Sequence, residues 1–306
     1  NSLNGLCRAF FEPTSRALLS DITPSQHKLL VFNLRYASIN LGVVFGPIIG
    51  LYLGSAESTF PFIIAGMVYV MYGLVLLFQF SIRHTDLPRP VNTLAPSLRT
   101  ALSTTTRDRV FLMVLIGTTF CELGYGHFGS TLAQYLTLNP NIENGSQIFS
   151  YMFSLNAMTV LLVQYPIVRT ARHYSPIASL ILGNILIAGS LLLFGWADGL
   201  VVLFISVILF TIGEVLLFTM MDLFIDRIAK PENKGIYFGT IGFNHLGSVI
   251  APVFGGLLLG HFGAANGVSV FAPLALATAL GLPFLWKARQ HEISRKRQEK
   301  VFQASA

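Results

Sequence analysis

Charged residues are scarce in this chain. Only 11% of its 306 residues are Asp, Glu, Lys or Arg, whereas 53% are hydrophobic. A water-soluble domain usually carries about 25% charged residues, so the chain has too little polar surface to cover a soluble body of this size. The mean hydropathy of +0.64 indicates the same. The composition therefore predicts a membrane protein.

Residues that carry enzymatic or metal chemistry are also sparse. Cys7 and Cys121 both fall inside apolar segments, so a disulfide framework is not expected. The seven histidines are scattered without metal-ligand spacing, and no metal or other cofactor is expected. An HExxH helix is absent and no convincing Ser–His set is found, so an enzyme is not expected. A membrane sensor should carry a sizeable soluble domain, which the polar segments are too short to form.

Long apolar runs are what the sequence has in quantity. A helix needs about 20 apolar residues to cross the hydrocarbon core, and only helices and closed barrels satisfy their backbone groups there. Barrel strands would be shorter and would alternate. We therefore expect an all-α membrane protein with about nine spans, near residues 1–20, 30–54, 60–82, 110–137, 147–168, 175–196, 199–225, 236–260 and 267–287.

One long polar connection, residues 83–109, interrupts this series and contains Pro88, Pro90 and Pro96. It is expected to be a cytoplasmic loop between two helical units. The first unit is residues 1–82, with three spans, and the second is residues 110–287, with six. Residues 288–306 are expected to form a polar tail.

Basic residues fall on one side of the predicted spans. Seventeen of the 20 Lys and Arg residues lie in alternate loops and the tail, and the opposite loops carry none. Lys and Arg are enriched in cytoplasmic loops, so the carboxyl terminus is expected in the cytoplasm. The net charge of +6 follows from this asymmetry. It favours anionic lipid headgroups as neighbours over a nucleic-acid partner.

An internal repeat relates the second span to the eighth. Each residue of one glycine–proline–glycine set has a counterpart 205 positions later; the pairs are Gly42 and Gly247, Pro47 and Pro252, and Gly50 and Gly255. The loops before these spans also correspond, with Asp21 matching Asp226 and Lys28 matching Lys234. The repeat sets the first three spans against the last three and leaves the middle three without a partner. Together with the first residue, Asn1, this predicts that a three-helix unit is missing before residue 1.

The residues around the second span resemble the major facilitator superfamily. The run Gly42-Val43-Val44-Phe45-Gly46-Pro47-Ile48-Ile49-Gly50 is similar to the antiporter motif of that family's fifth span. Leu34-Arg35-Tyr36 and Asn40 precede it as in drug:proton antiporters. Arg8 stands where the fourth-span motif has a basic residue, although Glu12 replaces the usual glycine. The resemblance covers nearly the whole chain in span layout.

The resemblance implies a helical bundle in which the nine spans are the family's fourth to twelfth. Residues 1–82 would then be the second half of the amino-terminal bundle. It implies a monomeric, multi-pass transporter of the plasma (inner) membrane that exports small amphipathic compounds by alternating access, driven by protons. Proton-coupled uptake of peptides or other solutes is the alternative, and transport is expected of the longer parent chain.

The spacing of the glycines in the second span predicts close helix packing. Gly42, Gly46 and Gly50 recur every four residues, which places them on one helix face where a neighbouring backbone can approach closely. Pro47 removes a backbone donor and favours a bend. The resemblance implies that this bend shapes the transport pathway, and ordinary helix packing is the alternative.

Charged side chains within the predicted spans are candidate pathway residues, because charges are costly in a membrane and usually face a cavity or a partner. Spans 60–82, 175–196 and 267–287 have none in their interiors, which fits outer supporting helices. The remaining spans supply the predicted substrate and proton pathway: Arg8, Glu12, Arg35, Tyr36, Asn40, Glu122, Glu214, Asp222, Asn244 and His245.

Glu122 and Glu214 are the preferred proton carriers, because neither has a basic residue within one helical turn. Either acid could instead pair with Arg35 across the two units. Arg8 and Glu12 lie four residues apart and could neutralise each other. Asp222 is either a pathway acid or a hydrated group near the cytoplasmic end. For His245, a structural hydrogen-bonding role is the alternative to titration.

Overall fold

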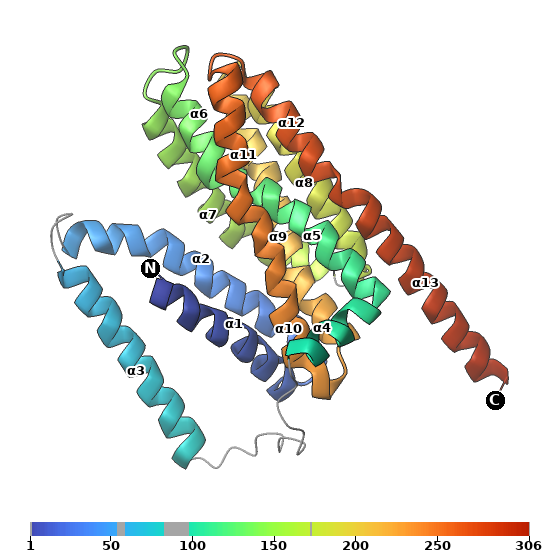
Figure 1. Ribbon diagram of the computed structural model, residues 1–306. Coiled ribbons are helices and arrows are strands. Elements are labelled where there is room, and N and C mark those ends of the chain that lie inside the picture. Colours follow the sequence, from blue (N-terminus) through green and yellow to red (C-terminus); the bar gives the residue numbers. More distant parts are fainter. Residues whose placement is uncertain (1, 54–58, 83–97, 172, 306) are drawn as a thin grey trace.

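The computed structural model describes residues 2–53, 59–82, 98–171 and 173–305, and every regular element within these ranges is helical (Figure 1). The all-α fold class is therefore confirmed. Eight helical segments are long and apolar enough to cross a membrane.

The helices follow one another along the chain in this order: α1 (Ser2–Ile22), α2 (Lys28–Leu53), α3 (Phe60–Ile82), α4 (Leu98–Arg107), α5 (Arg109–His127), the π-helical turn η1 (Phe128–Leu132), α6 (Ala133–Leu138), α7 (Gly145–Ala171), α8 (Pro176–Trp196), α9 (Leu200–Ile228), the 3₁₀ turn η2 (Pro231–Asn233), α10 (Lys234–Ile241), the 3₁₀ turn η3 (Gly242–His245), α11 (Leu246–Phe262), α12 (Gly267–Ala279) and α13 (Gly281–Ser305).

The predicted spans agree with these helices to within a few residues, with one departure. Helix α1 forms where a span was expected, but it is not among the eight segments apolar enough to cross a membrane on its own. It carries Glu12, Arg16 and Asp21, so it depends on protein partners for its polar groups.

Three of the long segments are interrupted. Segment 109–138 contains the π-helical turn η1, and segment 234–262 contains η3, which begins at Gly242. The predicted span 267–287 is broken at Leu280. Pro283 lies in the first turn of α13 and has no backbone N–H to continue the hydrogen bonding of α12. Past this break α13 runs to Ser305, so the described part of the predicted tail is helical.

The predicted polar connection also contains a helix. Residues 83–97 lie outside the described part of the chain, but α4 forms at 98–107 and packs against α5 and α10. Asp108 then begins α5, because its side chain accepts hydrogen bonds from the backbone N–H groups of Val110 and Phe111 at 3.1 Å.

The helices divide into two groups (Figure 1). We refer to α1–α3 as the N-terminal helices and to α5–α13 as the C-terminal bundle. Helix α1 packs against α10, and α2 packs against α7 and α9, whereas α3 has its main contact with α2. Between Phe62 and Gln79, α3 has no buried residue, which suits a helix surrounded by lipid.

Pairs of facing glycines hold the C-terminal bundle together. A Cβ atom built on either member of a pair would come within 3.2 Å of the carbonyl oxygen of the other. These pairs join α8 to α9, α8 to α12, and α5 to α13: Gly183 with Gly213, Gly195 with Gly267, and Gly117 with Gly281. Small residues let helix backbones approach closely in a membrane, where packing replaces the hydrophobic effect.

The repeated glycines of the second and eighth spans differ in their surroundings. A Cβ on Gly247 would collide with the backbone of Thr119 in α5, and one on Gly255 would collide with Thr131. Outside their own helix, no described residue has an atom within 4 Å of the Cβ positions of Gly42 and Gly46. The described residues therefore show no close approach at these two glycines, whereas Gly247, the repeat partner of Gly42, has one. The surroundings of Pro47 and Gly50 lie outside the described part.

The contact between α11 and α5 gives a test of this packing. Gly247→Ala should destabilise the protein by about 1–3 kcal/mol, because the added methyl group displaces the backbone at Thr119. The measurement is thermal unfolding in detergent. Gly256→Ala on the same helix is the matched control; its Cβ would meet open space, so it should be neutral or stabilising by up to about 1 kcal/mol. Equal effects of the two substitutions would contradict the packing.

Candidate functional site

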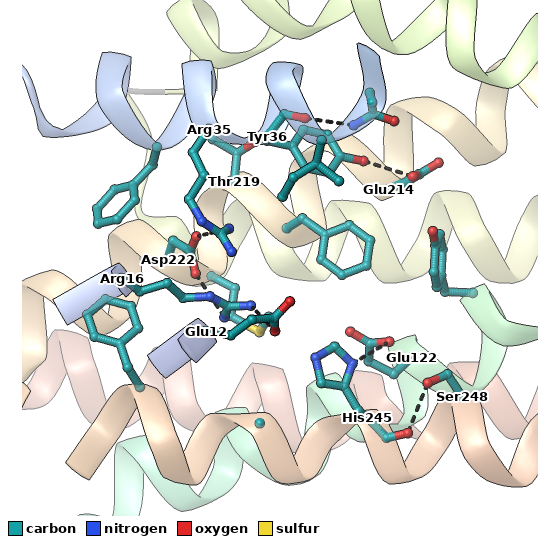
Figure 2. Close-up of a pocket in the computed structure, with 18 of the residues that line it drawn as sticks. Glu12, Arg16, Arg35, Tyr36, Glu122, Glu214, Thr219, Asp222, His245 and Ser248 are labelled. Atoms are coloured by element: carbon teal, nitrogen blue, oxygen red, sulfur yellow. Dashed lines mark hydrogen bonds and ion pairs between the residues drawn. The ribbon is translucent and has the colours of Figure 1, made fainter. Parts of the chain in front are cut away.

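A cavity of about 690 Å³ lies between α1 and α2 on one side and the C-terminal bundle on the other. Its lining comes from α1, α2, α5, η1, α7, α9, α10, η3 and α11. Among the described residues, α3, α8, α12 and α13 contribute none, which agrees with the prediction that these are outer helices. Figure 2 shows charged side chains from several helices pointing into this space.

The first charged group in the cavity is centred on Asp222 of α9. Its Oδ1 atom accepts a hydrogen bond from Arg16 Nη1 at 3.3 Å, and its Oδ2 atom lies 3.6 Å from Arg35 Nη1. Arg16 also pairs with Glu12 at 3.4 Å, one turn earlier in α1. We call Glu12, Arg16, Arg35 and Asp222 the charge cluster. It contains two acids and two bases, so its formal charge is balanced, and it connects α1 and α2 to α9 (Figure 2).

Glu214, two turns before Asp222 in α9, has neutral partners. The Tyr36 hydroxyl donates to its Oε1 atom at 2.8 Å, and Asn156 Nδ2 donates to its Oε2 atom at 2.7 Å. The carboxyl is 3% exposed. These hydrogen bonds join Glu214 to an α2 tyrosine and an α7 amide, at the junction of the N-terminal helices and the bundle.

Glu122 of α5 lies on the opposite wall of the cavity. Its Oε2 atom is 3.5 Å from His245 Nδ1, and Asn244 Nδ2 donates to its Oε1 atom at 3.5 Å. Both partners come from η3, where the 3₁₀ turn brings two consecutive polar side chains to the acid. The Asn244 amide also donates to the Met221 sulfur at 3.3 Å.

Aromatic rings form the wall between the two acids. Tyr36 stacks on Phe218, and Tyr125 meets Phe218 edge to face with ring centroids 5.0 Å apart. Phe128 stacks on Phe210 with centroids 4.8 Å apart. Such rings offer a large apolar surface with a negative face, which suits flat or cationic ligands.

A second ionic group lies outside the cavity, at the end of the bundle where α9 ends and α10 begins. We call it the basic end. Asp226 accepts from Lys28 Nζ at 2.6 Å and lies 3.2 Å from Lys234 Nζ, which also pairs with Asp21 at 3.0 Å. The Ser20 hydroxyl donates to Asp226. The repeat matched Asp21 with Asp226 and Lys28 with Lys234. In the structure the pairs are crossed, so each repeat unit supplies a lysine to the aspartate of the other.

Most of the predicted pathway residues meet in the cavity. Eight of them line it: Glu12, Arg35, Tyr36, Asn40, Glu122, Glu214, Asp222 and His245. Asn244 stands behind Glu122 rather than in the lining. The Asn40 amide donates to the Tyr36 backbone carbonyl at 2.9 Å, so this contact is local. The side chain of Arg8 lies outside the described part.

The structure also shows which of these predicted residues contact one another. Glu12 pairs with Arg16, four residues after it, and the predicted pairing with Arg8 lies outside the described residues. Arg35 pairs with Asp222, not with Glu122 or Glu214 as the predicted cross-unit pairing required. Asp222 is 6% exposed and lies between two arginines, so the alternative of a hydrated group is wrong.

Two residues of the site were missed by sequence reasoning. Arg16 is not among the predicted pathway residues, although its spacing of four from Glu12 places both on one helix face. Asn156 was overlooked in an apolar span. An amide in such a span is itself a signal, because buried polar groups need partners, and Asn156 has Glu214 and Thr211.

Comparison with known proteins bears directly on this arrangement. The sequence profile described as Major Facilitator Superfamily matches residues 2–244 and, in a second match, residues 114–305. The uncharacterized MFS-type transporter YqjV of Bacillus subtilis is 50% identical over 285 residues, which cover 93% of this chain and 69% of that protein. The chain belongs to the major facilitator superfamily. It is thus a multi-pass membrane transporter rather than an enzyme.

More distant members of the superfamily carry functional names. The Na(+), Li(+), K(+)/H(+) antiporter of Planococcus maritimus is 22% identical over 274 residues, covering 82% of this chain and 65% of its own length. Multidrug resistance protein 1 of Bacillus subtilis is 23% identical over 291 residues, covering 94% and 72% respectively. The crystal structure of the human organic anion transporter MFSD10 superposes with a TM-score of 0.69 at 18% identity, covering 89% of this chain and 67% of that one. This last likeness shows the fold alone.

The charge cluster gives a direct test of the contact between this transporter's two helix groups. A double-mutant cycle of Asp222→Asn and Arg35→Gln should show a coupling free energy of roughly 0.5–3 kcal/mol, because the two side chains contact each other at low exposure. The measurement is unfolding of the purified chain in detergent.

The control cycle pairs Arg35→Gln with Asp198→Asn, whose acid is exposed in the loop before α9. The effects of these two substitutions should add. Additive effects in the Asp222 cycle as well would contradict the pairing.

Proposed function

We propose that this transporter exports small amphipathic compounds, driven by protons, through alternating access of the cavity between α1–α2 and the C-terminal bundle. The observation that carries the proposal is the combination of an aromatic wall with two buried acids, Glu122 and Glu214, that lie outside the balanced charge cluster.

The cavity chemistry favours ligands that are both flat and basic. Stacked rings such as Tyr36 with Phe218 offer apolar contact, and the two acids leave the lining with an excess of negative groups over Arg16 and Arg35. A cation is attracted by carboxylates and by ring faces alike. The name of Multidrug resistance protein 1 is consistent with ligands of this kind.

Proton coupling is assigned to the same two acids. Among the described residues, neither carboxyl has an arginine or lysine partner, and both are 1–3% exposed. Binding a proton and binding a cationic ligand are then competing ways to neutralise such a buried carboxylate. Competition of this kind couples proton entry to ligand exit. The name of the Planococcus maritimus relative, an antiporter that exchanges H(+), is consistent with this scheme.

The proposed orientation places the basic end in the cytoplasm. Loops and helix ends there carry Lys28, Arg109, Arg227, Lys230 and Lys234, which the distribution of basic residues around membrane spans favours. Residues 1–82 and 110–287 would act as two units that rock about the cavity in the plasma membrane, in a monomeric protein. The crossed lysine–aspartate pairs would close the cavity at its cytoplasmic end.

Neutral substitutions of the two acids test this function. In the full product of the gene, reconstituted in proteoliposomes, Glu214→Gln and Glu122→Gln should each lower accumulation of a lipophilic cationic dye driven by a pH gradient by at least about tenfold, or about 1.4 kcal/mol. Glutamine keeps the size and hydrogen-bonding capacity of the side chain but cannot release a proton. Dye fluorescence quenching measures the effect.

The control is Glu143→Gln, an exposed acid in the loop between α6 and α7, which should transport normally. Exchange of dye against dye, which needs no net proton movement, should persist in the Glu214 and Glu122 variants. Undiminished pH-driven accumulation in both variants would remove the basis of the proton assignment.

A further inference from the structure

A second pocket, of about 600 Å³, lies away from the central cavity, where α5 begins beside α13. Leu285 and Ala288 of α13 are fully buried, and Leu285 packs on Gly117 of α5. Helix α5 begins at Arg109, whereas α13 continues to Ser305. The pocket therefore forms at a step, where one helix of a packed pair starts and its neighbour extends further.

Polar and basic side chains line this step. They are Arg107, Asp108, Arg109, His291, Ser294, Arg295 and Gln298, together with Val110. The α13 members have spacings of three and four, so they occupy one helix face. Arginine guanidinium groups present planar forks of N–H donors that match the oxygens of a phosphate group.

Among the described residues that line the pocket, Asp108 is the single acid, and it already has partners within the protein. Asp108 Oδ1 accepts from the backbone N–H groups of Val110 and Phe111, and Asp108 Oδ2 accepts from the Tyr237 hydroxyl at 3.0 Å. Glu292, next to the pocket in sequence, accepts from Ser175 of the α7–α8 loop. The three pocket arginines thus outnumber the acid, and the pocket is suited to an anion.

The pocket lies where two candidate membrane-spanning segments have their ends. One apolar segment begins at Arg109, and another, Gly267–Arg295, ends at Arg295. Both boundaries pass through the pocket. Trp286 is 53% exposed on α13, with the Arg289 guanidinium 5.9 Å from its ring centroid. Exposed tryptophan is typical of the membrane–water interface.

From these observations we propose that the pocket between the start of α5 and the extension of α13 binds the phosphate group of an anionic phospholipid. Arg107, Arg109 and Arg295 would contact the phosphate, while Ser294 and Gln298 would bond to the headgroup. Basic pockets between helices at this level are suited to anionic headgroups.

Native mass spectrometry of the purified full chain tests the proposal. Phosphatidylglycerol and phosphatidylcholine with identical acyl chains are titrated separately, and the first bound lipid is counted. We expect phosphatidylglycerol to bind the wild-type chain roughly tenfold more tightly, as for one or two charge-assisted hydrogen bonds. Equal binding of the two lipids would overturn the proposal.

Matched variants localise the effect. Arg109→Gln with Arg295→Gln should abolish the preference for phosphatidylglycerol. Arg227→Gln with Arg297→Gln removes the same charge from exposed residues outside the pocket lining, and the preference should remain. Equal loss in both double variants would show a diffuse charge effect and overturn the site.

A third double variant keeps the proposal testable if the Arg109→Gln, Arg295→Gln variant does not fold. Arg109→Lys with Arg295→Lys keeps the charge but removes the planar forks, so the preference should weaken without disappearing, at an unchanged unfolding temperature. An unchanged preference would overturn the arginine assignment. Inorganic phosphate is the final probe. If it displaces phosphatidylglycerol and stabilises the lipid-free chain in detergent, the pocket takes a soluble anion and the lipid assignment is wrong.

Discussion

A charge inside a membrane protein has to be compensated by protein, because lipid tails offer it neither water nor a counterion. This constraint accounts for the contact between the two helix groups. Asp222 is held by an arginine from α1 and an arginine from α2, and Asp226 by Lys28 of α2 and Lys234 of α10. The acids of α9 thus determine where α1 and α2 lie. It also explains why α1 can be too polar to span on its own and still pack against the bundle.

The acids of the cavity fall into two groups, those paired with arginine and those bonded to other side chains. Glu12, Arg16, Arg35 and Asp222 neutralise one another, so they serve as a connection between helices. Glu214 and Glu122 are bonded to a tyrosine, to amides and to a histidine. The tyrosine and the amides stabilise a carboxyl group without cancelling its charge, and His245 cancels the charge of Glu122 only when it is protonated. The acids of the charge cluster therefore differ from Glu122 and Glu214 in having arginine partners.

Much of the fold follows from the sequence, because a span is a local property. Apolar length placed the helices to within a few residues, and the absence of interior charges identified the outer helices. The breaks were harder to predict. The 3₁₀ turn that carries His245 to Glu122 depends on packing between α11 and α5, and no local pattern marks it. The helix α4 lies within a stretch too polar to be recognised by hydropathy.

The pairings of the site depended on tertiary structure. Glu12 has an arginine four residues away on either side, and spacing alone could not show that Arg16 joins Glu12 to Asp222. Asp222 and Arg35 are far apart in the sequence, and only the packing of α2 on α9 shows which acid Arg35 reaches. The glycine repeat showed the same limit: Gly247 meets a neighbouring backbone, whereas its counterpart Gly42 does not meet one within the described residues.

The facing glycines of the C-terminal bundle have a mechanical consequence. Where Gly183 meets Gly213 and Gly195 meets Gly267, backbone touches backbone, and no rotamer is available to absorb a displacement. The contact between α1–α2 and the bundle includes, beside the rings of Phe32 and Tyr36, long lysine and arginine side chains, whose several torsions can follow movements of a few ångströms. The bundle is therefore stiff inside, and its contact with α1 and α2 is the part that deforms more easily. A force applied to the cavity would move whole helices there before it distorted any of them.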